Sequence, residues 1–312
     1  MAKYLGVDTS NYTTSVCIYD AQEHAFYQQA KVLEVRLGER GLRQSDALFQ
    51  HTVNLPVLMR ALQEQGVCQD IAAVGVSTRP RRVEGSYMPC FLAGVSAATS
   101  AAAALNVPCR EFSHQEGHIM AVLSGLEAQE RQQLLSGPFL ALHLSGGTTE
   151  LLFTQREGEA FHVEVVGGSR DISVGQLIDR TGVMLGMKFP CGRELDALSL
   201  EGSYAPRLRL ACSEGWFHLS GYENQVKQLI EKQTPPQDVA RFALKAVTVN
   251  LGKMLDTLPE QYANLPLVVM GGVASNTLVR RSLSARQDHR AYFSTGERSR
   301  DNAMGIAYLA SL

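Results

Sequence analysis

Two histidines one helical turn apart are the residues whose types and spacing most directly indicate chemistry in this sequence. The stretch EFSHQEGHIM, residues 111–120, places His114 and His118 four positions apart. On an α-helix of about 3.6 residues per turn, such positions lie on one face, so the two imidazoles can converge on a single ion. A third ligand must then come from elsewhere in the chain. The alternative is a pair of helix histidines that bond to backbone carbonyls.

The position of Glu116 tests whether this pair belongs to a peptidase. In the H-E-x-x-H motif of zinc peptidases the glutamate directly follows the first histidine, about 100° around the helix axis. Glu116 follows His114 by two residues, which places it about 200° around and facing away from the metal. It is badly placed to activate a metal-bound water, so the sequence disfavours proteolysis.

The elements that must position these residues form a repeated pattern. Residues 3–20 predict a β-hairpin with a polar tip, and residues 138–154 predict a second hairpin with Gly146 and Gly147 in its turn. Between the hairpins we expect a helix over about 46–65, a buried strand over 71–78 and, at 124–137, a polar connection between domains. The recurrence of the hairpin indicates a duplicated α/β fold with two domains, residues 1–135 and 136–312.

Later segments predict a strand, a glycine pair and a helix start over residues 266–285, followed by a last helix after Asp301. Backbone N–H groups at such a helix start can bind an anion or a nucleotide. No segment matches a P-loop or a Rossmann fingerprint. The order of hairpin, hairpin, Asp179 in a helix, Gly192 and the strand-Gly-Gly-helix is nevertheless typical of the ATP site of the actin, sugar-kinase and heat-shock ATPase superfamily.

Composition narrows the class of protein. The formal charge of −2 and the pI near 6.5 give no general attraction for nucleic acid, so contact with RNA would need a local basic patch. The six cysteines show no C-x-x-C spacing, and reduced cytosolic thiols are the simplest interpretation. The uncharged run 90–108 is rich in Ala, Ser and Gly, which favours a tightly packed interior helix over a membrane span. We expect a cytoplasmic protein with no membrane partner.

Taken together, the motifs resemble those of the tRNA N6-adenosine threonylcarbamoyltransferase family, once called O-sialoglycoprotein endopeptidase, over nearly the whole chain. An H-x-E-G-H element, an S-G-G-x-T turn and a D-N-x-A-M helix start are more specific together than any one of them. The resemblance implies an actin-like ATPase fold, in which two RNase H-like lobes enclose a cleft and the last helix packs back toward the N-terminal lobe. It is carried by SHQEGHIMAVL, LALHLSGGTTELL, GQLIDRTGVMLGMKFPCGREL, FHLSGYENQ, LVVMGGVASNTLVRR and RDNAMGIAYLA.

The resemblance also implies roles for particular residues. The metal ligands of the family fall on His114, His118 and Asp301, a set suited to Fe or Zn. Asp8 keeps one carboxylate of a first hairpin that is acidic in the family, and the resemblance makes it the candidate catalytic residue. The alternative for Asp301 is a helix cap. Contacts to ATP or threonylcarbamoyl-AMP fall on His143, Leu144, Ser145, Gly146, Gly147, Asp179, Gly192 and Asn276.

Two of these nucleotide contacts have a simpler alternative. Asp179 could accept hydrogen bonds from ribose hydroxyls, or it could be an ordinary surface carboxylate of a helix. Asn276 could bond a polar edge of the ligand, or it could cap a helix.

The sequence departs from the family where substrates are handled. DTSNYTT replaces the acidic run of the first hairpin, and RPRRVEGS replaces a glycine-rich loop, so Arg79, Arg81 and Arg82 are candidate phosphate contacts or a solvated loop. Glu223 stands where the family has Lys, and Thr148 where it has His. These changes indicate a divergent paralogue.

Three hypotheses for the function remain open. The first is metal-dependent transfer of threonylcarbamoyl from its adenylate to N6 of a tRNA adenosine, in company with an inactive paralogue and an ATPase, as the resemblance implies. The second keeps the transfer but changes the acceptor to a small molecule. The third is a nucleotide-binding paralogue that has lost transfer activity.

Overall fold

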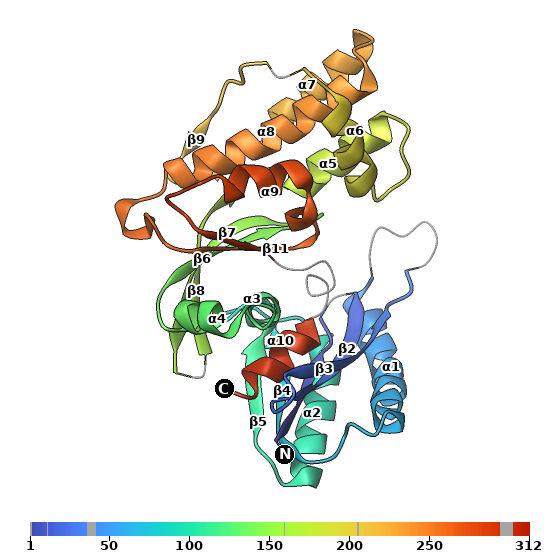
Figure 1. The fold of residues 1–312 in the computed structure, drawn as a ribbon. Helices are drawn as coiled ribbons and strands as arrows, with labels where there is room; N and C mark the ends of the chain where they lie inside the picture. Colours follow the sequence, from blue (N-terminus) through green and yellow to red (C-terminus); the bar gives the residue numbers. More distant parts are fainter. Residues whose placement is uncertain (1, 11, 36–41, 159, 205, 294–301) are drawn as a thin grey trace. The chain divides into compact units, whose positions relative to one another are not determined.

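The computed structural model describes residues 2–10, 12–35, 42–158, 160–204, 206–293 and 302–312. The chain divides into two compact units, each built around one β-sheet (Figure 1). The first unit comprises Met1–Arg131, Arg156–His162 and Glu297–Leu312, and the second comprises Gln132–Gln155 and Val163–Gly296. The C-terminal helix is therefore part of the same unit as the N-terminal hairpin.

The first unit contains a five-stranded sheet in the order β3-β2-β1-β4-β5. Strands β1, β2 and β3 are antiparallel neighbours, whereas β4 runs parallel to β1 and β5 runs parallel to β4. The strands are β1 (Lys3–Asp8), β2 (Thr13–Asp20), β3 (Ala25–Val32), β4 (Ile71–Arg79) and β5 (Cys109–Ser113). The helices assigned to it are α1 (Gln44–Glu64), α2 (Phe91–Leu105), α3 (His114–Leu123) and α10 (Asn302–Leu309).

Alternation along β1 explains why helices cover both faces of this sheet. Leu5 and Val7 point into a core with residues of α1 and α2, such as Leu58 and Ala98. Gly6, between them, faces α10, and a methyl group there would overlap the backbone of that helix. The small residue therefore lets α10 lie directly on the sheet.

The second unit contains a seven-stranded sheet in the order β12-β11-β6-β7-β8-β10-β9. Here β7 is antiparallel to β6, β11 runs parallel to β6, and β12 runs parallel to β11. The strands are β6 (Phe139–Leu144), β7 (Thr149–Glu157), β8 (Ala160–Ser169), β9 (Cys212–Ser213), β10 (Trp216–Phe217), β11 (Leu267–Met270) and β12 (Ala291–Phe293).

Helix α8 is the longest helix of the second unit and lies beside four others (Figure 1). One side of it is buried without interruption, from Val239 to Leu255, against the interior face of the sheet. The helices of this unit are α5 (Val174–Met184), α6 (Gly192–Glu201), α7 (Ser220–Glu231), α8 (Pro236–Asp256) and α9 (Thr277–Ser284), with 3-10 turns η1 (Glu260–Tyr262) and η2 (Gly272–Ser275).

Both sheets repeat one arrangement. In each, a meander of three strands is followed by two strands that extend the sheet on the other side of the first strand, as β3-β2-β1-β4-β5 and as β8-β7-β6-β11-β12. This confirms the duplicated α/β pattern expected from the two hairpins. Strands β9 and β10 are an addition at the β8 edge.

Two segments differ from the prediction. The polar stretch expected as a connection forms the short helix α4 (Ala128–Leu135), because Leu134 and Leu135 supply a buried edge that the polar composition hides. Helix α2 is not an interior helix on all sides, since Leu92 and Leu105 are exposed. None of the described helices is long and apolar enough to span a membrane.

Candidate functional site

The two histidines of α3 lie side by side at the start of the helix. The ring centroids of His114 and His118 are 4.6 Å apart and the rings meet edge to face. The helix begins there because Ser113 caps it: the Ser113 hydroxyl accepts the Glu116 N–H, and the Glu116 carboxylate accepts the Ser113 N–H at 2.7 Å. Glu116 is fully buried in this capping box, as its position two residues after His114 requires.

Asp8, at the end of β1, orients the first of these rings. Its Oδ2 accepts a hydrogen bond from His114 Nδ1 at 3.0 Å, and its Oδ1 accepts from the N–H and the hydroxyl of Ser10 at 2.8 and 2.5 Å. Burial would raise the pKa of Asp8, but the His114 ring and the Ser10 donors hold it well below its ordinary value. A histidine that donates from Nδ1 to a carboxylate can present the lone pair of Nε2 to a metal.

Helix α10 packs against the turn that carries the histidine pair. Gly305 on α10 lies against Gly117, which stands between the two histidines, and a methyl group on Gly305 would overlap the Gly117 carbonyl. Gly305 follows Asp301 by four residues. The middle of α10 is thereby fixed against α3 within the first unit.

The predicted third metal ligand, Asp301, lies outside the described residues. Among the residues that the structure describes, no group of three or more His, Cys, Asp and Glu side chains could hold a metal ion. The donor chemistry of the pair itself fits a metal such as Zn or Fe, because two imidazoles share one face and a carboxylate lies behind one of them.

The arginine loop is tied to acidic groups close to α3. Arg82 donates to Glu116 at 3.3 Å and to the Glu111 carbonyl at 3.1 Å, and Arg79 lies 3.9 Å from the Glu111 carboxylate. Two of the three candidate phosphate contacts are thus already engaged by protein acceptors. Arg81 carries a backbone hydrogen bond to the Ser86 hydroxyl.

In the second unit, hydrogen bonds of Ser145 and Ser173 fix the conformation of the predicted phosphate turn. Ser145 closes the turn by accepting the Thr148 N–H at 3.0 Å, and Ser173 donates to the Gly146 carbonyl at 2.8 Å. Gly175 at the start of α5 allows the helix to touch this turn, since a methyl group there would overlap Ser145. Around Gly146 itself there is open space.

His143 and Leu144 precede this turn in β6. Leu144 is fully buried, so its side chain belongs to the core of the second unit. The His143 backbone pairs with Met270 of β11, and Gly271, at φ +92°, then turns the chain against the Leu144 carbonyl. The positive φ favours glycine at this crossing of two strand ends.

The Asp179 carboxylate is bonded to the residue that precedes Gly192. Asp179 Oδ1 accepts the N–H of Cys191 at 2.9 Å, and Gly192 is the first residue of α6. Asp179 is therefore more than an isolated carboxylate of a helix surface. A methyl group at Gly192 would point into open space.

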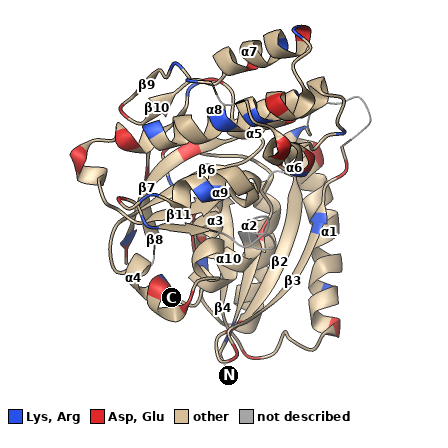
Figure 2. Ribbon diagram, turned by 45° about the horizontal axis from the view of Figure 1, so that its top comes forward, with Lys and Arg blue, Asp and Glu red and all other residues tan. Residues whose placement is uncertain are grey.

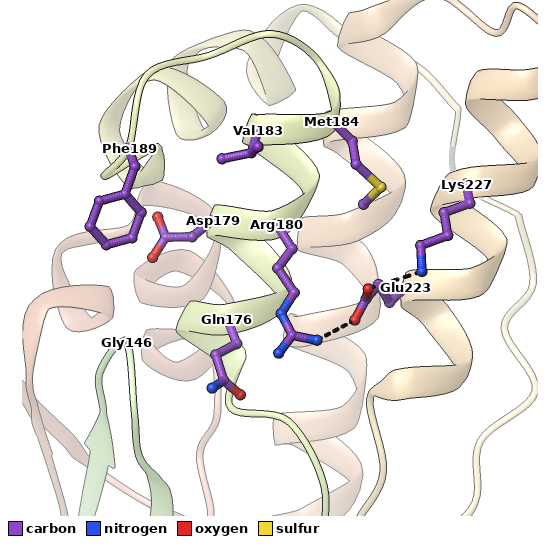
Figure 3. Close-up of a pocket in the computed structure, with 9 residues that line it drawn as sticks. All are labelled: Gly146, Gln176, Asp179, Arg180, Val183, Met184, Phe189, Glu223 and Lys227. Atoms are coloured by element: carbon purple, nitrogen blue, oxygen red, sulfur yellow. Dashed lines mark hydrogen bonds and ion pairs between the residues drawn. The ribbon is translucent and has the colours of Figure 1, made fainter. Parts of the chain in front are cut away.

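Gly146 and Asp179 line one pocket of about 520 Å³. Figure 3 shows the Asp179 carboxylate beside Phe189 and the Arg180 side chain reaching toward Glu223. Arg180 and Lys227 contact Glu223 at 2.7 and 3.2 Å. Burial would raise the pKa of Glu223, but hydrogen bonds from these two cations lower it. The pocket is lined by Gly146, Gln176, Asp179, Arg180, Val183, Met184, Phe189, Glu223 and Lys227.

Asn276 acts as a helix cap in this structure. Its Oδ1 accepts the N–H groups of Leu278 and Val279 at the start of α9. The next residue, Thr277, donates from its N–H and hydroxyl to Asp196 of α6, both at 2.9 Å. The start of α9 is therefore tied to the helix that Gly192 begins.

Sequence reasoning did not identify the apolar lining of this pocket. Val183, Met184 and Phe189 carry no chemistry-bearing group, and their gathering depends on how α5 and the following loop fold. Glu223 could be singled out from the sequence, because it stands where the family has Lys. The pairing with Arg180, 43 positions away, became visible only in the structure.

Comparison with known proteins identifies the family of this chain. The sequence model of the family described as tRNA N6-adenosine threonylcarbamoyltransferase matches residues 27–308. Curated proteins of that name are similar over nearly the full length. The one from Persephonella marina is 30% identical, covering 98% of this chain and 88% of the relative. The one from Buchnera aphidicola is 28% identical, with coverages of 99% and 92%. The chain belongs to this family of transferases.

Solved structures show the fold at lower sequence identity. The chain is similar to HypF from T. kodakarensis, with a TM-score of 0.60, 11% identity, and coverage of 99% of this chain and 47% of that one. It is also similar to component A of (R)-2-hydroxyglutaryl-CoA dehydratase from Acidaminococcus fermentans, with a TM-score of 0.53, 14% identity and coverages of 99% and 98%. The protein has the actin-like ATPase fold, as expected.

Proposed function

We propose that this protein transfers a threonylcarbamoyl group from threonylcarbamoyl-AMP to N6 of a tRNA adenosine. The observation that carries the proposal is the histidine pair of α3, in which Asp8 holds the His114 ring by a hydrogen bond. The chain matches the family over residues 27–308. The acceptor nitrogen would form a bond to the carbamoyl carbon, the bond from that carbon to the phosphate oxygen would break, and AMP would leave.

The first unit would supply the reacting end of the site. His114 and His118, with Asp301, would hold a divalent metal, which when bound supplies Lewis acidity toward the carbamoyl carbonyl. Asp8 is 1% exposed and both of its oxygens accept protein hydrogen bonds, so it suits a positioning residue that fixes the His114 ring. Our prediction that Asp8 is catalytic is accordingly refined to a positioning role.

The second unit would supply the nucleotide end. The turn at Gly146 and Gly147 would approach the phosphate through backbone N–H groups, since no side chain fills the space there. Asp179 has one oxygen bonded to Cys191, which leaves its other oxygen as the acceptor for a ribose hydroxyl. Gly192 and the capped start of α9 would border the remainder of the nucleotide.

The test is a transfer assay with purified protein, threonylcarbamoyl-AMP and tRNA that lacks the modification. Mass spectrometry of the digested tRNA should show threonylcarbamoyl-adenosine, and the amount formed should match the AMP released. The companion proteins of the family are added in a parallel arm. Adenylate breakdown without modified tRNA in both arms would refute tRNA as the acceptor.

A second candidate is transfer to a small-molecule acceptor, and Glu223 favours it. A carboxylate occupies the pocket wall where the family has Lys, and it is paired there with Arg180 and Lys227. Replacement by the family residue, Glu223→Lys, would place the new lysine beside Arg180 and Lys227. Repulsion among these three cations should move their side chains apart and widen the pocket. If Glu223→Lys transfers more threonylcarbamoyl to tRNA than the unaltered protein does, the presence of Glu in place of the family's Lys indicates that the acceptor has changed.

A further inference from the structure

Gln176, in the first turn of α5, is held in one orientation by a capping box. The Ser173 hydroxyl accepts the Gln176 N–H at 3.0 Å, and Gln176 Oε1 accepts the Ser173 N–H, also at 3.0 Å. A backbone N–H bonds to the oxygen of a side-chain amide and not to its nitrogen, so this contact fixes the two ends of the amide. The fold therefore uses the oxygen of Gln176 and leaves the nitrogen, with two N–H groups, for another partner.

That nitrogen lies at the pocket that Gly146 and Asp179 also line. Gln176 is partly buried, and among the residues that the structure describes none accepts a hydrogen bond from its Nε2. Figure 3 shows the amide between Gly146 and Arg180. Donors that line a pocket without a protein acceptor are available to a bound ligand.

The capping box also brings Gln176 to the phosphate turn. Ser173 donates its hydroxyl to the Gly146 carbonyl at 2.8 Å. Gly175, the residue before Gln176, lies against the same turn, since a methyl group on it would be 2.6 Å from Gly146 Cα. The space beside Gly146 and Gly147 is open. An anion bound to the N–H groups of this turn would therefore lie close to the Gln176 amide.

A second capping box in the molecule shows that a neutral side chain is not needed for the cap. In α3 the same position is held by Glu116, which is fully buried, accepts N–H groups of Ser113 and Phe161, and pairs with Arg82 at 3.3 Å. Glutamate and glutamine both serve at this position of a capping box. The difference at Gln176 concerns what faces the pocket: an amide donates to an anion, whereas a carboxylate would repel it.

The pocket has no excess of basic side chains that could bind a phosphate by charge. Arg180 and Lys227 both contact Glu223, at 2.7 and 3.2 Å, and Asp179 adds a second carboxylate to the lining. Figure 2 shows acidic and basic residues together on α5, α6 and α7. A phosphate in such a site is bound mainly through N–H donors, which makes each uncommitted donor important.

We propose that Gln176 Nε2 donates a hydrogen bond to the phosphate of the adenylate at the Gly146 turn. This role rests on the proposed function, which names the nucleotide. In threonylcarbamoyl-AMP this phosphate belongs to the leaving group. It gains negative charge as its bond to the carbamoyl carbon breaks, so a donor at this place also stabilises the departing AMP.

Titration calorimetry of the full chain with AMP, and with adenosine, which lacks the phosphate, tests this role. Gln176→Glu keeps an oxygen for the cap of α5 but replaces the donor by a negative charge. Affinity for AMP should fall by about tenfold or more, while affinity for adenosine changes by less than about threefold. Gln133→Glu is the matched control, since it adds the same charge at an exposed position of α4 outside the pocket, and both affinities should stay as in the parent. Both variants should keep the thermal midpoint of the parent protein.

Unchanged AMP affinity in Gln176→Glu, or an equal fall for AMP and adenosine, would overturn the proposal. A parent protein that binds AMP no more tightly than adenosine would overturn it too. The transfer assay separates this role from the proposed function. Modified tRNA from the parent, together with normal AMP binding by Gln176→Glu, would refute the role of Gln176 alone. AMP binding that depends on Gln176, without transfer to tRNA in either arm of the assay, would refute the proposed function alone.

Discussion

Asp8 Oδ2 lies 3.0 Å from His114 Nδ1, which joins the end of the first strand to the start of α3 across 106 positions of sequence. The carboxylate is fixed by Ser10 on its other oxygen, so the ring it holds has one orientation. Because His118 lies one turn along the same helix, this single contact sets the geometry of the pair.

Loss of the Asp8 charge should loosen metal binding. Asp8→Asn keeps the size of the side chain but removes the anionic acceptor, and we expect zinc affinity to fall by about 10- to 100-fold in a competitive chelator titration. Asp20→Asn is the control, because Asp20 is a buried carboxylate that ends β2 and accepts backbone N–H groups of the following turn. Equal loss in both variants would assign Asp8 a role in folding alone.

The contact between α3 and α10 should tolerate no added methyl group. Gly305→Ala would overlap the Gly117 carbonyl, so α10 must shift, and we expect a loss of roughly 1–3 kcal/mol in the free energy of unfolding. Gly221→Ala should have a much smaller effect, since nothing lies within 4 Å of the added atom in α7. Urea unfolding of both variants measures the difference. An unchanged midpoint for Gly305→Ala would show that the two helices do not pack as described.

Gly146 in the phosphate turn and Gly175 in α5, which packs on that turn, should separate binding from stability. Gly146→Ala adds a methyl group in open space, so the protein should stay as stable as the parent while its affinity for AMP falls by about tenfold. Gly175→Ala should instead destabilise the second unit, because its methyl group overlaps Ser145. Calorimetric titration and thermal unfolding give the two readings. Unaltered AMP affinity in Gly146→Ala would remove this turn from the site.

Asp171 should make the second unit sensitive to acid. Burial would raise its pKa, but the N–H groups of Leu219 and Ser220, at the start of α7, lower it to about 2. A carboxylate with a lowered pKa stabilises the fold above its ordinary pKa of 3.8, and this contribution is lost as the pH falls toward 2. Asp171→Asn should therefore cost roughly 1 kcal/mol at pH 6 and clearly less at pH 3. Equal losses at both pH values in urea unfolding would contradict this assignment.

The local parts of this account were predictable from the sequence. Strand alternation and polar turns located both hairpins, and the four-residue spacing placed His114 and His118 on one face of a helix. The long-range parts were not predictable, because pattern alone does not reveal which distant side chains meet. The contacts from Asp8 to His114 and from Arg180 to Glu223 both depend on how separate elements pack.

The metal content of the protein, purified without chelator and measured by mass spectrometry, tests the central claim most directly. The account predicts one Fe or Zn ion per chain, its loss in His118→Ala, and its retention in His162→Ala, which removes an exposed histidine outside α3. A parent protein without metal after incubation with either ion, or a His118→Ala variant that retains a full equivalent, would contradict the assignment of the α3 histidines as the metal site.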